Sequence, residues 1–241
     1  MTGCRNHAAS HTPKTGYARE TMRTILNTLR NEAESTIRAF YALQQFKLLL
    51  TNLEDVDRIN TNINFWEIYE SSLLTKVFIG IRRIFENNND TFNFQRALNL
   101  IKQNIVDFQP TALEQRKLKG YNERPDWIDE YMADVYDPCE DDFNILSKLV
   151  RSNSKKMKGV YTEAASKIFA HAIHTDATSI NNLLADIDLD EIETSLNAIW
   201  HFYEQVWHMY ENGRKPYQAI SPYPYKDEVQ QSVIQQLRSG A

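Results

Sequence analysis

The spacing of apolar residues predicts a chain built from α-helices. Within residues 18–50, apolar side chains recur at three- and four-residue steps and mark one face of a long helix: Ile25, Leu29, Ala33, Ile37, Phe40 and Tyr41. Within residues 62–87 they cover nearly every side of a helix, which is typical of a helix that other helices surround. Charged residues interrupt this second stretch, which excludes a membrane span. We therefore expect residues 62–87 to form the central helix of a helical bundle.

Shorter helices are predicted in the middle of the chain. Thr91 is a good N-cap for a helix that continues to about Ile105. Thr111 and Glu114 form a capping box for a helix over residues 111–119. Two further helices are expected from Glu140 and over residues 161–175. Another begins at Pro125 and should turn these side chains inward: Trp127, Ile128, Tyr131, Met132 and Val135.

The clearest pattern lies in residues 188–213. Asp188 is the predicted N-cap, and Asn212-Gly213 is the predicted end. Between them, one apolar seam follows a 3-4 spacing: Leu189, Ile192, Leu196, Ile199, Tyr203, Val206 and Tyr210. Aromatic residues widen this seam on both sides, so we expect two neighbours, one from the chain's own core and one from a second subunit.

Composition places these helices in one domain. The chain has 241 residues, and its low content of Gly and Pro, seven of each, argues against an all-β fold. We expect a disordered lead-in at 1–15, a helical domain at 16–213, and a Pro- and Tyr-rich tail at 214–241 with a weak helix over 227–238.

Charge and cysteine content narrow the function classes. The net charge of −5 means that contact with RNA would need a local basic patch. Two cysteines without a CxxC pair argue against a zinc site and fit a reducing compartment. The N-terminus has no apolar run, so we expect a cytoplasmic protein without a membrane partner and without a cofactor.

One cluster of residues could cleave a phosphodiester. His171 and His174 share a helical face, and Lys167 lies four residues before His171. A histidine could carry the proton while the lysine stabilises charge on the phosphorus, without a metal ion. The alternative is a solvated lysine beside a polar helix end, because such spacings also arise by chance.

Two stretches resemble the HEPN proteins, and in particular their abortive-infection branch. Residues 166–176, SKIFAHAIHTD, are similar to the HEPN helix that reads R-N-K-x-F-A-H-R-D. Residues 65–86 begin with aromatic residues and end in Arg83-Ile84-Phe85-Glu86, as the second helix of that branch often does. The order of helices over residues 20–213 also fits this family.

The resemblance implies an all-α bundle, a homodimer and a metal-independent ribonuclease. In such proteins the site is an arginine, four to six residues, and then a histidine. His171 matches the histidine, but the permitted arginine positions hold Ala164, Ala165 and Ser166. Lys167 has the outer permitted spacing only if His174 is counted instead, and lysine lacks the planar fork of arginine.

Two other groups of residues could form functional sites. His201, Glu204 and His208 have a spacing that can bind a metal, but the seam places them on the solvated back of their helix, so we assign no metal. A basic segment could contact RNA together with the basic residues at 116–119, or it could be an ordinary solvated charge run. Its residues are Arg151, Lys155, Lys156 and Lys158.

Two functions follow as alternatives. In the first, the protein acts on RNA through His171, with His174, and through a cation from Lys167 or Arg83. In the second, it is a non-catalytic helical module that binds another protein or subunit through the aromatic helix and the tail. The sequence carries no phosphate-binding loop, no dinucleotide-binding glycine motif and no serine-hydrolase elbow, which weakens other enzyme classes.

Overall fold

The computed structural model describes residues 21–86, 91–155, 157–161, 165 and 188–239. Within this part of the chain, all regular secondary structure is helical, as predicted. Its first half contains α1 (Met22–Leu49), α2 (Leu53–Asn60), α3 (Ile63–Phe85), α4 (Phe94–Gln103), η1 (Ile105–Phe108) and α5 (Pro110–Leu118). Its second half contains α6 (Trp127–Ala133), α7 (Glu140–Asn153), the short π-helix η2 (Met157–Tyr161), α10 (Leu189–Asn212) and α11 (Lys226–Ser239).

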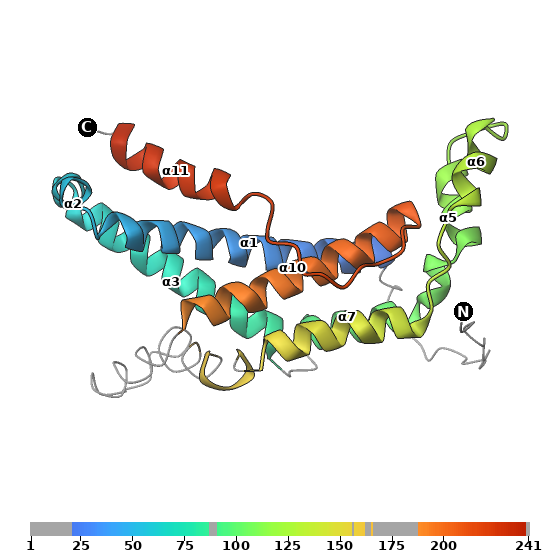
Figure 1. Ribbon diagram of the computed structural model, residues 1–241, viewed down its shortest axis with the longest axis horizontal. Coiled ribbons are helices and arrows are strands. Elements are labelled where there is room, and N and C mark those ends of the chain that lie inside the picture. Colours follow the sequence, from blue (N-terminus) through green and yellow to red (C-terminus); the bar gives the residue numbers. More distant parts are fainter. Residues whose placement is uncertain (1–20, 87–90, 156, 162–164, 166–187, 240–241) are drawn as a thin grey trace.

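Helix α1 is the centre of the molecule. It packs against α3, α4, α10 and α11, and it buries side chains along its whole length (Figure 1). Our expectation that residues 62–87 form the enclosed central helix is therefore wrong. The first half of α3 lies against one side of α1, where Trp66 stacks on Phe46 at 5.6 Å between ring centroids. Its other side is open, and Phe65 and Ile68 are 45% and 68% exposed.

The second half of α3 approaches α1 very closely. A Cβ atom added to Gly80 would lie 2.1 Å from Oγ1 of Thr36 on α1. Only glycine therefore fits at this contact, and the backbone of α3 rests almost directly on α1. Val77, Phe78 and Ile81 are consequently buried, and η2 packs against the same helix.

Helix α10 lies beside α1 and α7, and its far side is covered by the chain's own tail. After α10 the chain turns back along the helix, and Tyr223 inserts its ring between Tyr41 and Trp200, at 6.2 and 5.0 Å between centroids. Helix α11 then packs on α1 (Figure 1). We call residues 214–225, which return along α10, the strap.

The predicted helix ends are partly correct. Asp188 caps α10 by accepting from the backbone N–H groups of Asp190 and Glu191, and Gly213 ends it with a left-handed φ of 61°. Two other caps are wrong. Asn93 rather than Thr91 caps α4, and α5 begins at Pro110, before the predicted capping box.

Helices α5 and α6 form an arm at one end of the molecule (Figure 1). The expectation that α6 turns five side chains inward is also wrong. Ile128 alone among them is buried, whereas Trp127 is 41% exposed. A helix of seven residues makes only about two turns, so the one face by which it packs holds few side chains.

Several predictions lie outside the described residues, namely the lead-in at 1–15 and most of the helix at 161–175. No helix in the described part of the chain combines the length and the apolar content that a membrane crossing needs.

Candidate functional site

The candidate catalytic residues Lys167, His171 and His174 lie outside the described residues. The residues on either side of that segment are described, and they meet. The hydroxyl of Tyr161 accepts a hydrogen bond from the backbone N–H of Asp188 at 2.9 Å and lies 3.2 Å from Oε2 of Glu191. Burial raises the pKa of Tyr161 to about 12, so this hydroxyl keeps its proton near neutral pH. Tyr161 and Asp188, which stand on either side of this segment in the sequence, are therefore in direct contact at the start of α10.

This junction is anchored to α3. Helix η2, which ends at Tyr161, packs against α3, and Met157, Tyr161 and Ala165 are buried. Burial of one apolar side chain contributes about 1.5–3 kcal/mol, so three together hold this point of the chain firmly against the bundle. The chain is thus held against α3 at residues 157–161.

A groove of about 470 Å³ runs along α3, and we call it the α3 groove. Its lining includes two cations, Lys76 and Arg83, which are seven residues apart and therefore lie on the same side of the helix about 10 Å apart along its axis. The hydroxyl residues of the lining all precede Lys76 on α3. The remaining lining residues are Ser71, Ser72, Thr75, Ile79 and Gly80.

Arg83 is a predicted site residue whose side-chain contact and exposure the structure gives. Its Nη1 lies 3.5 Å from Oε1 of Glu32, and its side chain is 58% exposed. An exposed ion pair of this length contributes about 0–1 kcal/mol. Arg83 can therefore turn toward an anion in the α3 groove at little cost.

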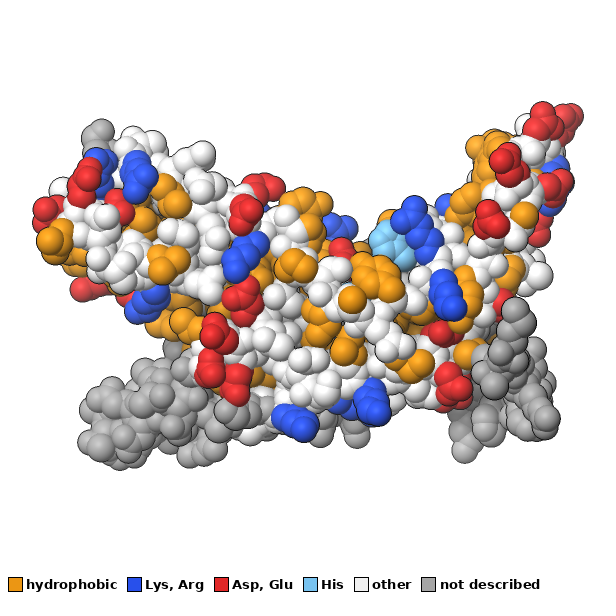
Figure 2. All heavy atoms as spheres, in the orientation of Figure 1, with side chains coloured by type: hydrophobic (Ala, Val, Ile, Leu, Met, Phe, Trp, Pro, Cys, Tyr) orange, Lys and Arg blue, Asp and Glu red, His pale blue; other side chains and the backbone are white. Residues whose placement is uncertain are grey.

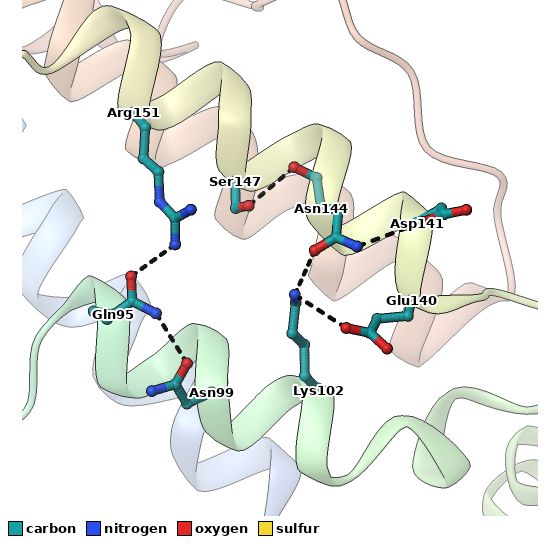
Figure 3. A network of polar contacts seen from close by, with 8 residues as sticks. All are labelled: Gln95, Asn99, Lys102, Glu140, Asp141, Asn144, Ser147 and Arg151. Atoms are coloured by element: carbon teal, nitrogen blue, oxygen red, sulfur yellow. Dashed lines mark hydrogen bonds and ion pairs between the residues drawn. The ribbon is translucent and has the colours of Figure 1, made fainter. Parts of the chain in front are cut away.

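Arg151 and Lys155 lie at the end of α7, both exposed. Figure 3 shows that Arg151 donates to Oε1 of Gln95 on α4 at 2.8 Å, as part of a set of polar contacts between α4 and α7. In the same set, Lys102 contacts Glu140 at 3.4 Å and also bonds Asn144. The bond to Gln95 uses one edge of the Arg151 guanidinium and leaves the rest of this group exposed to solvent. Lys156 lies outside the described residues.

The basic residues of α5 do not join this group. Arg116 donates to the backbone oxygens of Asp107 and Tyr210 at 2.6 and 2.5 Å, and its guanidinium lies 3.9 Å above the Tyr210 ring. It therefore joins α5 to α10. Helix α5 also stands at the opposite end of α7 from Arg151 (Figure 1). The one large patch that would unite the two basic segments does not form among the described residues.

The expected solvated position of His201 is wrong. Its side chain is fully buried, and its Nε2 lies 3.0 Å from the backbone oxygen of Tyr217 in the strap. Burial lowers the pKa of His201, so the ring is neutral and Nε2–H is the donor. Among the described residues, no three His, Cys, Asp or Glu side chains lie close enough to hold a metal ion.

His201 belongs to a row of polar side chains on α10 that form hydrogen bonds with the backbone of the strap. Asn197, His201 and Gln205 are four residues apart and lie along one side of α10. Oδ1 of Asn197 accepts from the backbone N–H of Tyr223 at 2.9 Å, and Oε1 of Gln205 accepts from that of Tyr217 at 3.1 Å. The side of α10 opposite its apolar seam is therefore covered by the strap.

Sequence reasoning missed Lys76 as a site residue. It treated residues 62–87 as enclosed, so a lysine there carried no functional weight. The seven-residue spacing to Arg83, with the hydroxyl residues Ser71, Ser72 and Thr75 shortly before Lys76, was the available signal.

Comparison with known proteins gives one match. The family described as HEPN_AbiU2, AbiU2, matches residues 20–231 of the chain. No curated protein and no solved structure matches. The match covers every described helix from α1 to α10 and the start of α11.

Proposed function

Because the chain belongs to the AbiU2 family of HEPN proteins, an abortive-infection family, we propose that it is a phage-defence protein that binds RNA and cleaves it without a metal ion. The observation that carries the proposal is the α3 groove. It presents two exposed cations and three hydroxyls on the helix against which η2 packs. Phosphate oxygens are the ligands that such a set of donors suits.

The groove offers the cation that the sequence motif lacks. No arginine precedes His171 at the expected spacing, but Arg83 lies on α3, the helix against which η2 packs. Arginine can bind two phosphate oxygens at once, which lysine cannot. We therefore assign charge stabilisation to Arg83, with Lys76 as the second phosphate contact and Lys167 as an additional cation.

The chemistry needs only the RNA and the side chains. His171 or His174 would take the proton of the ribose 2′-hydroxyl, whose oxygen attacks the adjacent phosphorus. The 5′-oxygen leaves and takes a proton from the second histidine or from water. Arg83 would stabilise the extra negative charge on the phosphorane-like transition state.

The test of cleavage uses purified protein, labelled mixed RNA and EDTA. We expect cleavage to survive chelation and to be abolished by His171→Ala. Absence of cleavage by the wild-type protein across several RNAs would overturn the catalytic part of the proposal. Cleavage that His171→Ala leaves unchanged would overturn the assignment of His171.

The test of binding uses the salt dependence of affinity. Each phosphate contact to single-stranded RNA contributes about 0.7 to the slope of log K against log salt. We expect Lys76→Ala/Arg83→Ala to lower that slope by about 1.4 and to weaken binding. Arg38→Ala is the control, because Arg38 is exposed and lies about 200° around α1 from Thr36, which faces α3. An unchanged slope in the double variant would exclude the α3 groove as the RNA site.

A further inference from the structure

A second groove, of about 580 Å³, separates the α5–α6 arm from the end of α10. We call it the α6 groove. Figure 2 shows the hollow from one side, with Asp and Glu side chains on the arm and Lys, Arg and His side chains gathered at the body. Its lining residues are Trp127, Glu130, Tyr131, Asp134, Val135 and residues 212–215.

The arm contributes a wall of aromatic and acidic side chains. Trp127, Glu130, Tyr131 and Asp134 follow the spacing of one helical face on α6. Lys117 lies 5.3 Å above the Tyr131 ring and covers it, whereas Trp127 is 41% exposed. The Trp127 ring meets Tyr121 and Tyr131 in T-shaped contacts at 6.2 and 5.8 Å between centroids, and its exposed part is available to a flat ligand.

The body contributes a basic wall that is held rigidly. Arg214 and Lys215 follow Gly213, whose left-handed φ of 61° sets the turn. A Cβ at Gly213 would lie 2.6 Å from Cγ1 of Val135, so the turn is packed directly against the arm. The hydroxyl of Tyr131 donates to the backbone oxygen of Asn212 at 3.1 Å and joins the two walls. A groove built in this way needs little reorganisation to bind a ligand.

Among the described residues, the acidic side chains of the arm and the basic side chains of the body form no ion pairs across the α6 groove. None of Glu130, Asp134 and Arg214 forms an ion pair within 4.0 Å with any residue in the described part of the chain. Lys215 likewise has no described carboxylate partner and lies 5.8 Å from the centre of the Tyr136 ring. The groove thus holds an exposed ring, two cations and two carboxylates, each without a partner of opposite charge.

We propose that the α6 groove binds one nucleotide of a single-stranded RNA, which rests on the proposed function in RNA binding. The base stacks on Trp127, and the phosphate lies against Arg214 and Lys215. The amino group of the base donates to Glu130 or Asp134. A nucleotide is the ligand class that carries an anion, a flat ring and hydrogen-bond donors on one small molecule.

The carboxylates also give a base preference. Adenine, cytosine and guanine carry an amino group that a carboxylate can accept from. Uracil presents a carbonyl oxygen at the corresponding position, and two oxygens facing each other without a proton repel. The α6 groove therefore disfavours uracil.

The experiment measures nucleotide binding apart from cleavage. AMP, CMP and UMP are titrated into the protein while tryptophan fluorescence is followed, and labelled oligo(A) and oligo(U) are titrated by anisotropy. We expect quenching by AMP and CMP, weaker quenching by UMP, and loss of the quenching in Trp127→Phe. Trp66 and Trp200 are buried, and the half-buried Trp207 lies beside Arg23 and Leu26 outside the α6 groove, so these three contribute the background that remains in Trp127→Phe.

Three variants of the full chain separate the contacts. Stacking on an aromatic side chain is worth about 5- to 150-fold in affinity, so Trp127→Ala should weaken oligo(A) binding at least about fivefold. Trp127→Phe, which keeps a ring, should weaken it less. Glu130→Gln/Asp134→Asn should remove the preference for oligo(A) over oligo(U) while the protein still binds both. Arg38→Ala again serves as the charge control, and thermal unfolding confirms that each variant folds.

The outcomes distinguish this inference from the proposed function. Quenching by AMP in a protein that cleaves no RNA overturns the catalytic proposal and keeps the nucleotide site. RNA binding that Trp127→Ala leaves unchanged, or equal affinity for oligo(A) and oligo(U), overturns the nucleotide site. The nucleotide site would also be overturned if the nucleotides caused no quenching and a protein partner bound without competing with either oligonucleotide.

Discussion

Gly80 sets the distance between α1 and α3. An added methyl group would overlap Oγ1 and Cγ2 of Thr36, at 2.1 and 2.7 Å from the new Cβ. Since both atoms belong to a buried side chain in the middle of α1, the helices must move apart to accept it. We predict that Gly80→Ala lowers the free energy of unfolding by about 1–3 kcal/mol, measured by chemical denaturation.

The control for this substitution is Gly159→Ala. A Cβ at Gly159 meets no described atom within 4 Å, so the change should leave the free energy of unfolding nearly unchanged. Equal effects of the two substitutions would show that loss of glycine, rather than the contact with Thr36, is responsible.

His201 makes the stability of the fold depend on pH. Burial lowers its pKa below the ordinary value of about 6.5, and no described group accepts a hydrogen bond from Nδ1. Below pH 6.5 the unfolded chain therefore binds more protons than the folded chain, and the free energy of unfolding falls as the pH falls. The stability contributed by the neutral ring is present above pH 6.5 and is lost as the pH passes down through the folded pKa.

We predict a shallower pH dependence in His201→Gln. Glutamine can still donate a hydrogen bond toward the backbone oxygen of Tyr217 but does not titrate. The measurement is the free energy of unfolding of both proteins between pH 5 and pH 8. His208, whose pKa burial also lowers, is left intact in both, so it contributes equally. Parallel curves would contradict the assignment to His201.

At the scale of elements, the strap is part of the core. The ring of Tyr223 is 2% exposed and packs between Tyr41 and Trp200, and its backbone N–H is bonded to Asn197. Removing a buried aromatic ring costs about 3–5 kcal/mol. We predict that Tyr223→Ala lowers the free energy of unfolding by that amount.

Tyr225→Ala is the matched control for the strap. Its ring is 49% exposed, and exposed substitutions usually change stability by less than about 0.5 kcal/mol. Thermal or urea unfolding of the two variants makes the comparison. Similar, small effects of both would mean that the strap covers α10 without stabilising it.

The helices themselves could be predicted from the sequence, but their neighbours could not. Residues 189–212 were predicted as one helix because the apolar spacing, Asp188 and Gly213 are all local signals. The buried position of His201 was missed because it depends on a segment that returns from residues 217–223. A helical pattern shows which side of a helix is apolar, but it does not show that polar side chains on the other side bond to a passing backbone.

The candidate site was predictable only in part, for a similar reason. Arg83 was singled out from the sequence, and it lines the α3 groove. Lys76 was missed because a helix that is apolar all round was taken to be enclosed, whereas α1 occupies the centre instead. Trp127 was expected in the core because five inward positions were assigned to α6, although this helix has only seven residues and buries Ile128 alone among those five.

At the scale of the whole molecule, α10 links the two grooves. Tyr161, at the end of the helix that packs on α3, bonds to Asp188 at the start of α10, and the α6 groove lies at its end. The 24 residues of α10 span about 36 Å. An RNA that runs along α10 from this junction to the α6 groove must therefore be extended over a comparable length, which suits a single strand better than a compact hairpin.

The open side of α3 is where we expect a second copy of the chain. Phe65 and Ile68 lie one turn apart on α3, and Leu53 of the adjacent α2 is 84% exposed. Exposed apolar surface of this kind is typical of subunit contacts, and in a symmetric dimer each residue of the contact occurs twice. We predict that the protein sediments as a dimer and that Ile68→Glu, which places two like charges in the contact, gives a folded monomer. Val106→Glu alters a residue that is 52% exposed on η1 and should leave the dimer intact. A wild-type monomer at micromolar concentration, or a dimer that Ile68→Glu does not weaken, would exclude this side of α3 as the subunit contact.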